Sequence, residues 1–310
     1  MLDDLLASLS FVDIFNVCVF IVFTVCYAYQ IIYVFVSLTH KPVIPAAKKN
    51  HRYAVIISAR NENAVIGDLI HSIRVQNYPQ ELIDIFVVAD NCTDNTAAVA
   101  QEAGAIVFPR FNTEKIGKGY ALDYGFTCIR EHYSDNNYEA YFVFDADNVL
   151  DVNYFREMNK VFDGGAIAST SYRNSKNYGS NWITAGYAVW FMREAKYLNQ
   201  ARLVLNTSCA VSGTGFFISA KIIDEMKGWN TTCLLRILNF LPALFLRAVV
   251  LHIAQPLCSM TNSLLPLRIR GISASAGLRA STRCSITMGQ VWLKACLPTR
   301  RVISLPAMTC

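Results

Sequence analysis

Two carboxylates with the spacing of a metal site follow an apolar run in the middle of the chain. Asp145 and Asp147 come directly after YFVF, in a D-x-D arrangement. Carboxylate oxygens of this kind suit Mg²⁺ or Mn²⁺, which keep several waters and bridge to the phosphates of a substrate. A capped turn at the end of a strand has the same pattern, so the spacing alone leaves both interpretations open.

Three further polar residues could bind a nucleotide. Asp90 and Asp94 lie at the end of the preceding long apolar run, where a carboxylate could accept hydrogen bonds from a base or ribose. Asp94 also fits an Asx turn with a helix cap. Lys118, in GKG, could meet a phosphate at a helix start. The Walker spacing and GxGxxG are both missing, which disfavours a P-loop or a dinucleotide fold.

Alternating strands and helices must position these residues. Short apolar runs rich in β-branched residues predict buried strands, and helical periodicity separates them, with Asn61 as a candidate cap of the first helix and Gly104 closing the second. This order predicts an α/β fold with a mostly parallel sheet, whose ligands lie at the carboxyl ends of the strands. The predicted strands are 53–59, 82–90, 105–110 and 138–147.

An apolar segment near the N-terminus predicts a membrane anchor. Ile14–Leu38 contains no charged residue and is long enough to cross a hydrocarbon core of ~30 Å. A cleaved signal peptide would have a basic start, whereas the segment 1–13 is acidic; a buried core helix is the other alternative. Basic residues gather in the linker 39–51 after the span, so the positive-inside rule places the following domain in the cytoplasm.

Five motifs together resemble the family 2 glycosyltransferases with the GT-A fold, in particular the membrane-anchored bacterial type related to cellulose and hyaluronan synthases. The motifs are VIISARNEN, VVADNCTDNT, GKGYALDYG, VFDADN and SGTGFFISAKII, in the order of the family. The resemblance runs from about Tyr53 to Trp229, within a predicted catalytic domain at 52–230. It implies inverting transfer from a UDP-sugar to a saccharide acceptor for polysaccharide synthesis at a bacterial cell membrane, with Mg²⁺ or Mn²⁺ as cofactor and no nucleic-acid partner.

The resemblance also implies roles for individual residues. Asp90 would contact the uracil, and Asp145 and Asp147 would hold the diphosphate through the cation. The second motif of the family usually has two adjacent acids. In this chain the two positions are Ala89 and Asp90, so Asp90 is the one acid left for the base contact. The expected nucleotide-sugar-binding set is Ala59, Glu62, Asp90, Lys118 and Asp145, and the expected acceptor-side set is Gly213, Thr214 and Gly215.

The last eighty residues lack acids altogether. All 23 Asp and Glu residues precede Thr231, whereas nine Lys and Arg residues follow it and produce the net charge of +5. The family's general base lies in a Thr-Glu-Asp motif, and its acceptor contacts lie in a Gln-x-x-Arg-Trp motif; neither occurs in this chain. Reading the codons of Leu234–Leu241 one base earlier permits Thr-Glu-Asp, hidden under Leu235, Arg236 and Ile237. The same shift over 258–280 permits Gln-Arg-Phe-Arg-Trp.

We therefore expect the tail 231–310 to be translated out of frame. An authentic, divergent basic domain is the alternative. The apolar stretch 234–258 resembles a second membrane helix, but two arginines and a proline inside it argue against one.

The missing base motif bears directly on activity. Because no general-base motif follows Asn230, we assign no catalytic base in this chain and expect its activity to be impaired. A non-catalytic nucleotide-sugar-binding remnant is one alternative function, and a nucleotidyltransferase, which would need a basic glycine-rich loop after the first strand, is another. The ten cysteines form no CxxC pair and predict no metal site or disulfide framework.

Overall fold

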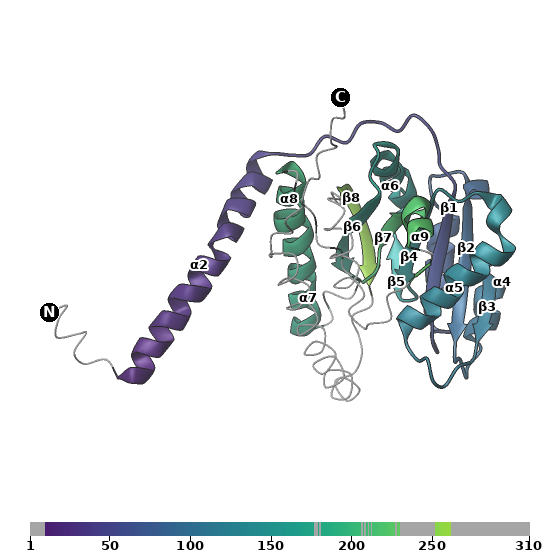
Figure 1. The fold of residues 1–310 in the computed structure, drawn as a ribbon, viewed down its shortest axis with the longest axis horizontal. Helices are drawn as coiled ribbons and strands as arrows, with labels where there is room; N and C mark the ends of the chain where they lie inside the picture. Colours follow the sequence, from purple (N-terminus) through teal and green to yellow (C-terminus); the bar gives the residue numbers. More distant parts are fainter. Residues whose placement is uncertain are drawn as a thin grey trace, which may run out of the picture.

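The computed structural model describes residues 10–229 apart from 177, 178, 180, 206, 208, 210, 212 and 227, together with the backbone of 252–261. A helix, α2 (Phe11–Thr39), projects from one side of a sheet covered by helices (Figure 1). Ser10 caps α2 and forms a capping box with Asp13. The helix is longer at both ends than the predicted span 14–38, and its most apolar stretch is not buried.

The sheet begins with four parallel strands in the order β3-β2-β1-β4. Their bounds confirm the four predicted strands to within two residues at each end: β1 Tyr53–Ala59, β2 Ile83–Asp90, β3 Ile106–Arg110 and β4 Ala140–Asp145. Buried apolar side chains on both faces of β1, β2 and β4 explain why these strands are nearly continuous hydrophobic runs, whereas β3 at the sheet edge is half-buried. The carboxyl ends of all four strands consequently meet at one edge of the sheet.

The rest of the sheet is mixed. β7 (Phe216–Ser219) pairs antiparallel with both β4 and β6 (Ala168–Ser175). The backbone of β8 (His252–Thr261) pairs parallel with β6 and antiparallel with the short β5 (Asn148–Leu150). Thus part of the stretch 234–258 is strand; the rest of that stretch lies outside the described residues.

Helices cover both faces of the sheet and form two hydrophobic clusters. One face packs against α3 (Ile66–Arg74), α4 (Thr96–Glu102) and α6 (Tyr154–Asp163). The other packs against α5 (Lys118–His132) and α9 (Ala220–Glu225), with Trp229 stacked on Phe126 at 5.4 Å between ring centroids. The 3₁₀ turns η1 (Gln80–Leu82) and η2 (Ser134–Asn136) precede β2 and β4.

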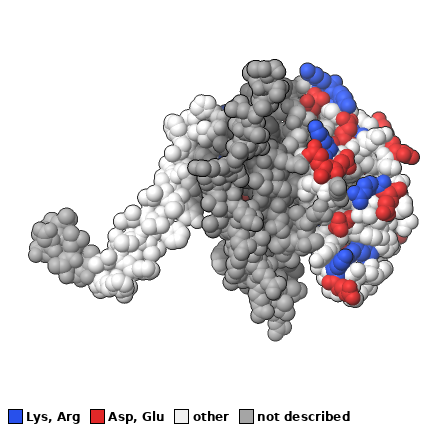
Figure 2. All heavy atoms as spheres, in the orientation of Figure 1, with Lys and Arg blue, Asp and Glu red and all other residues white. Residues whose placement is uncertain are grey.

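A second long helical segment stands between α2 and the sheet (Figure 1). It consists of α7 (Trp182–Met192), a π-helical turn η3 (Arg193–Asn199) and α8 (Gln200–Val204). Its α7 part packs on β6, and its η3 and α8 parts pack on α2. The charged side chains visible in Figure 2 gather on the sheet end of the molecule, whereas α2 shows an uncharged surface in this view.

Candidate active site

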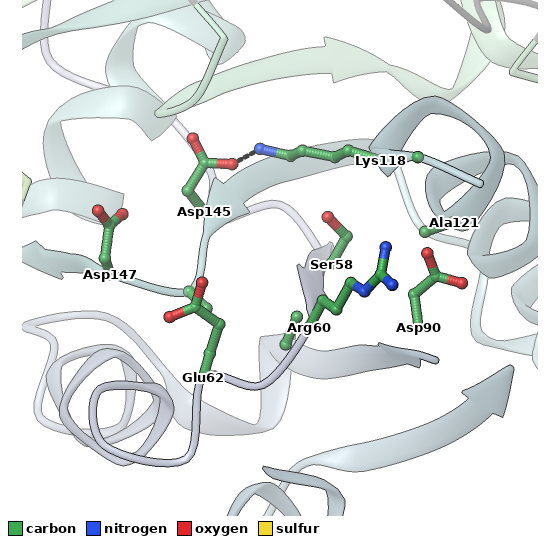
Figure 3. Close-up of a pocket in the computed structure, with 11 residues that line it drawn as sticks. Ser58, Arg60, Glu62, Asp90, Lys118, Ala121, Asp145 and Asp147 are labelled. Carbon is green, nitrogen blue, oxygen red and sulfur yellow. Dashed lines mark ion pairs between the residues drawn. The ribbon is translucent and has the colours of Figure 1, made fainter. Parts of the chain in front are cut away.

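A pocket of about 350 Å³ opens at the carboxyl ends of β1, β2 and β4 (Figure 3). The pocket brings together all five residues of the expected nucleotide-sugar-binding set and both expected metal ligands. Residues far apart in the sequence meet because the parallel strands end at the same edge of the sheet. The lining residues are Ser58, Ala59, Arg60, Glu62, Asp90, Gly117, Lys118, Ala121, Asp145, Ala146 and Asp147.

The turn after β4 holds the two carboxylates in place. Asp145 is the last residue of β4, and its main-chain N–H donates to Thr214 Oγ1 at 2.7 Å. Thr214 Oγ1 in turn donates to Asn148 Oδ1, and both of these side chains are buried. A hydrogen-bonded, buried turn of this kind presents Asp145 and Asp147 from a rigid support.

The carboxylates of the pocket lie in an environment that favours a cation. Burial raises the pKa of the Asp147 carboxyl, and the positive charge of Lys118 partly opposes this shift. Burial also raises the pKa of Glu62, and the charges of Asp147 and Asp94 raise it further. Such mutual destabilisation of carboxylates would be relieved by a divalent cation.

The donor set fits Mg²⁺ or Mn²⁺ that is shared with a substrate. Within the described part of the chain, no three His, Cys, Asp or Glu side chains converge on a common point as a protein-only metal cage would require. Asp145 and Asp147 supply two hard oxygen donors beside an open pocket. Mg²⁺ is usually bound in this way, by one or two carboxylates, with waters and phosphates completing the shell.

Lys118 begins α5 and reaches across the pocket to β4. Its ammonium forms an ion pair with the Asp145 carboxylate (Figure 3). Gly117 before it has φ +128°, a conformation that a residue with a side chain rarely adopts. The glycine thus allows the chain to turn into the helix with Lys118 directed at the carboxylates, as predicted for a lysine at a helix start.

Asp90 is held at the opposite side of the pocket by a residue that the sequence analysis missed. Asp90 ends β2, and Arg110 is its register partner at the end of β3. The Arg110 guanidinium pairs with the Asp90 carboxylate and also donates to the Lys115 carbonyl at 2.7 Å. Both side chains are buried. An arginine at the last position of the neighbouring strand was the available signal, but the register was needed to use it.

One local expectation was wrong. Asn61 does not cap α3, which begins at Ile66 with Val65 in the cap position. Asn61 instead adopts φ 56°, and its Oδ1 accepts from the Thr93 N–H at 2.8 Å. Asparagine tolerates this left-handed conformation, so it bridges the loops after β1 and β2 rather than starting the helix.

The Asx turn expected at Asp94 is present, although the helix cap falls one residue later. Asp94 Oδ1 accepts from the Thr96 N–H at 3.0 Å, while Asn95 occupies the cap position of α4. Gly104 follows α4 with φ +89°, as predicted for a closing residue. The five cysteines whose side chains the structure describes are free thiols.

The expected acceptor-side residues form the loop before β7. Gly213 and Gly215 have φ +37° and +67°, which favours glycine at both positions. Thr214 is buried beneath the Asp145 turn, and none of the three lines the pocket. Their role toward an acceptor stays a prediction.

The predicted catalytic domain ends at a residue that the structure does not describe. Asn230, the last residue of that domain and the point after which the general-base motif is missing, lies outside the described residues. The hidden motif at 235–237 lies outside them too. The absence of a catalytic base after Asn230 therefore stays a prediction from the sequence.

Comparison with known proteins identifies the family of this site. Residues 51–236 match the family described as "Glycosyltransferase like family 2". The beta-monoglucosyldiacylglycerol synthase of Synechocystis sp. is 25% identical over 177 residues, which cover 57% of this chain and 36% of that protein. The chain spans about a third of the length of the curated relatives that it matches first.

Solved structures share the fold. A mannosyltransferase from Pyrobaculum calidifontis, in complex with GDP-Man and Mn²⁺, superposes with a TM-score of 0.59 at 15% identity, covering 79% of this chain and 67% of that one. S. aureus TarS 1-349, in complex with UDP-GlcNAc, superposes with a TM-score of 0.50 at 13% identity, covering 69% and 60%. At these identities the likeness establishes the GT-A fold alone.

Proposed function

The chain belongs to the family 2 glycosyltransferases, and from this membership we propose that its pocket binds the nucleotide-diphosphate part of a UDP-sugar. The sugar would be transferred to an acceptor hydroxyl with inversion at the anomeric carbon. The observation that carries this proposal is the meeting of Glu62, Asp90, Lys118, Asp145 and Asp147 around one pocket. An arrangement of carboxylates with one lysine at a helix start suits a diphosphate accompanied by a divalent cation.

The two sides of the pocket would bind different parts of the donor, with the diphosphate on one side and the base on the other. Lys118 and the first N–H groups of α5 would bind phosphate oxygens, since a helix start favours negative charge. Asp145 and Asp147 would hold Mg²⁺ or Mn²⁺, which when bound neutralises charge on the leaving diphosphate. The carboxylate of Asp90, which Arg110 fixes in place, would accept a hydrogen bond from the base, with Ala59 and Glu62 lining the space between the two sides.

The acceptor and the location of the reaction are further parts of the proposal. We propose a saccharide acceptor, reached on the side of the Gly213–Gly215 loop, for polysaccharide synthesis at a bacterial cell membrane. The similarity to a glucosyldiacylglycerol synthase makes a lipid hydroxyl the alternative acceptor. Helix α2 would cross the bilayer, because it is long and apolar enough, and the basic linker after it would keep the catalytic domain, proposed to span 52–230, on the cytoplasmic side.

A reduced or absent turnover is part of the proposal. No acid follows Glu225 in the sequence, so the tail 231–310 offers no carboxylate that could deprotonate an acceptor. Loss of a general base costs about 10²–10⁴ in rate. The same observation favours a second candidate function, a non-catalytic protein that binds a nucleotide-sugar. Sequencing the gene around codon 230 tests the out-of-frame tail, because an intact reading frame there contradicts it.

The donor site is tested by calorimetric titration of the full chain with UDP, with and without Mn²⁺. We expect binding that depends on the cation and is lost in Asp145→Asn. Asp151→Asn is the matched control, since Asp151 is an exposed carboxylate outside the pocket. Tighter binding of GDP than of UDP would contradict the choice of donor, and binding that is indifferent to Mn²⁺ would contradict the cation site.

Turnover is measured separately, with UDP-sugars and a saccharide or lipid acceptor. A version with the reading frame restored after residue 230 serves as the reference. Binding without turnover in the present chain, but with turnover in the restored one, is the expected result. Equal rates in both would refute the proposed impairment.

A further inference from the structure

Helix α7 exposes an apolar surface that a protein in water would not normally show. The helix carries no charged side chain over its 11 residues. Trp182 is 84% exposed, Val189 59% and Trp190 56%. A helix on the surface of a soluble domain is usually polar on its outer face. Exposed apolar patches that include large aromatic side chains mark surfaces that meet a protein partner or a membrane.

The position of α7 indicates which partner it meets. The segment that continues α7 packs on the C-terminal part of α2. Ser37 Oγ donates to the Lys196 carbonyl at 2.5 Å, Gln200 Nε2 donates to the Ser37 carbonyl at 3.3 Å, and Arg193 donates to Gln30 Oε1. From this junction α7 and α2 run toward the same end of the molecule, with α2 tilting away from α7 (Figure 1). The apolar medium that surrounds an exposed, membrane-spanning α2 is then adjacent to α7 as well.

Aromatic and basic side chains gather at the junction of the two helices. The Arg193 guanidinium lies 5.6 Å from the centroid of the Trp190 ring. The Lys196 ammonium lies 5.7 Å from the Tyr197 ring, and Arg202 lies 5.8 Å from Tyr33 of α2. Tryptophan and tyrosine are enriched at the level of the lipid headgroups, where lysine and arginine meet anionic lipids. The uncharged α7 ends at these side chains, with Met192 as its last residue, and its Trp182 end lies away from them.

We propose that α7 is embedded in the same bilayer as α2, with its N-terminal end at the exposed Trp182 on the acyl chains and the girdle of Trp190, Arg193, Lys196 and Tyr197 at the headgroups. This inference rests on the proposal that α2 crosses the membrane. The opposite side of α7 packs on the catalytic domain, where the Arg173 guanidinium of β6 lies 4.6 Å from the Phe191 ring.

A consequence concerns the acceptor side of the sheet. Strand β6 pairs with β7, which directly follows the Gly213–Gly215 loop. Embedding α7 would hold this side of the domain against the membrane surface, so that an acceptor could approach from the bilayer.

Native tryptophans test this surface in the full chain reconstituted into vesicles of phosphatidylcholine brominated on its acyl chains. Wild type is compared with W182F/W190F, a substitution of exposed aromatic residues by another aromatic residue that leaves the core unchanged. Because two of the four tryptophans would contact lipid, we expect the bromines to quench wild type at least about twofold more than the variant. Trp229, which is buried in the domain, remains in both proteins as the internal reference.

Two outcomes would overturn the inference. If aqueous iodide rather than bromolipid quenches the two tryptophans, α7 lies in water. If neither reagent reaches them, a protein surface such as a second copy of the chain covers α7. Flotation of the vesicles with bound protein reports the anchor α2 independently, and titration with UDP reports the donor site, so failure of either proposal is distinguishable from failure of this one.

Discussion

Replacing Asp147 by Asn should affect the stability of the empty protein and the binding of nucleotide in opposite directions. Burial raises the pKa of Asp147, and the charge of Asp147 helps to raise that of Glu62. A carboxyl whose pKa is raised on folding contributes stability below its ordinary pKa, and that contribution is lost as the pH rises through the raised value. At neutral pH, Asp147→Asn should therefore stabilise the empty protein by ~0.5–2 kcal/mol, as substitutions that relieve an active-site conflict commonly do.

Nucleotide binding should weaken in the same variant. A ligand at 100 times its Kd adds ~2.7 kcal/mol to the free energy of unfolding. If loss of the Asp147 carboxylate weakens Mn²⁺-dependent UDP binding by about 100-fold, the same concentration of UDP adds only ~0.4 kcal/mol. The variant should consequently unfold at a higher temperature than wild type in EDTA, and at a lower temperature with saturating UDP and Mn²⁺.

Thermal unfolding of the detergent-solubilised full chain measures both effects. The scans are run in EDTA and in UDP with Mn²⁺, from mildly acidic to neutral pH. The advantage of Asp147→Asn in EDTA should grow as the pH rises. Asp151→Asn, which changes an exposed carboxylate outside the pocket, should behave as wild type throughout. A variant that is less stable than wild type in EDTA, or that keeps the full response to UDP, would refute the reasoning.

Three further substitutions, with Gly67→Ala as a control for the first, probe the support of the site. A Cβ on Gly125 would lie 2.8 Å from a methyl group of Val88, so Gly125→Ala should lower the free energy of unfolding by about 1–3 kcal/mol; Gly67→Ala, with its nearest contact at 3.7 Å, should be neutral or stabilising in the same urea titration. Arg110→Met leaves a buried carboxylate on β2 without its cation and should cost about 3–5 kcal/mol, with weaker UDP binding by calorimetry; unchanged values for both would contradict a buried pair. Thr214→Val keeps the shape of the side chain but leaves buried polar partners unsatisfied, which should cost about 1–3 kcal/mol and reduce Mn²⁺-dependent UDP binding, whereas wild-type binding would show that the turn after β4 does not need the hydroxyl.

The sequence predicted the parallel half of the sheet but not the mixed half. Strands β1, β2 and β4 are short runs of apolar residues buried on both faces, and this burial is visible as composition; the edge strand β3 is an apolar run that is only half-buried. Strand β6 reads ASTSYRNS, a polar sequence without apolar alternation. Its Ser171 hydroxyl is satisfied within the fold, by donation to the Gly215 carbonyl at 3.0 Å. Such pairing between distant segments leaves no periodic signal in the sequence.

The candidate site, like the sheet, was predicted from the sequence only in part. The residue types and the motif order predicted Glu62, Asp90, Lys118, Asp145 and Asp147 as site residues, because each lies at or just after the end of a strand or at a helix start. The partners that hold them were not predicted. Arg110 acts through the register of β3 on β2, and Thr214 reaches Asp145 from a loop 69 residues further along the chain. The residue types that bind a ligand can be read from short motifs, but the partners that position them depend on which strands become neighbours in the fold.

By itself, the sequence determined the kind of chemistry and the expected anchor of this protein, because carboxylates, glycines and an uncharged apolar helix are informative wherever they fold. It also shows that every acid precedes Thr231, a fact that no structure is needed to see. Only the tertiary structure decided that five side chains from four segments share one pocket, that Asp90 is paired and buried, and that the helical segment begun by α7 meets the end of α2 with the aromatic residues of α7 exposed. Those properties arise from contacts between distant segments, whose free energies are settled only when the whole chain packs.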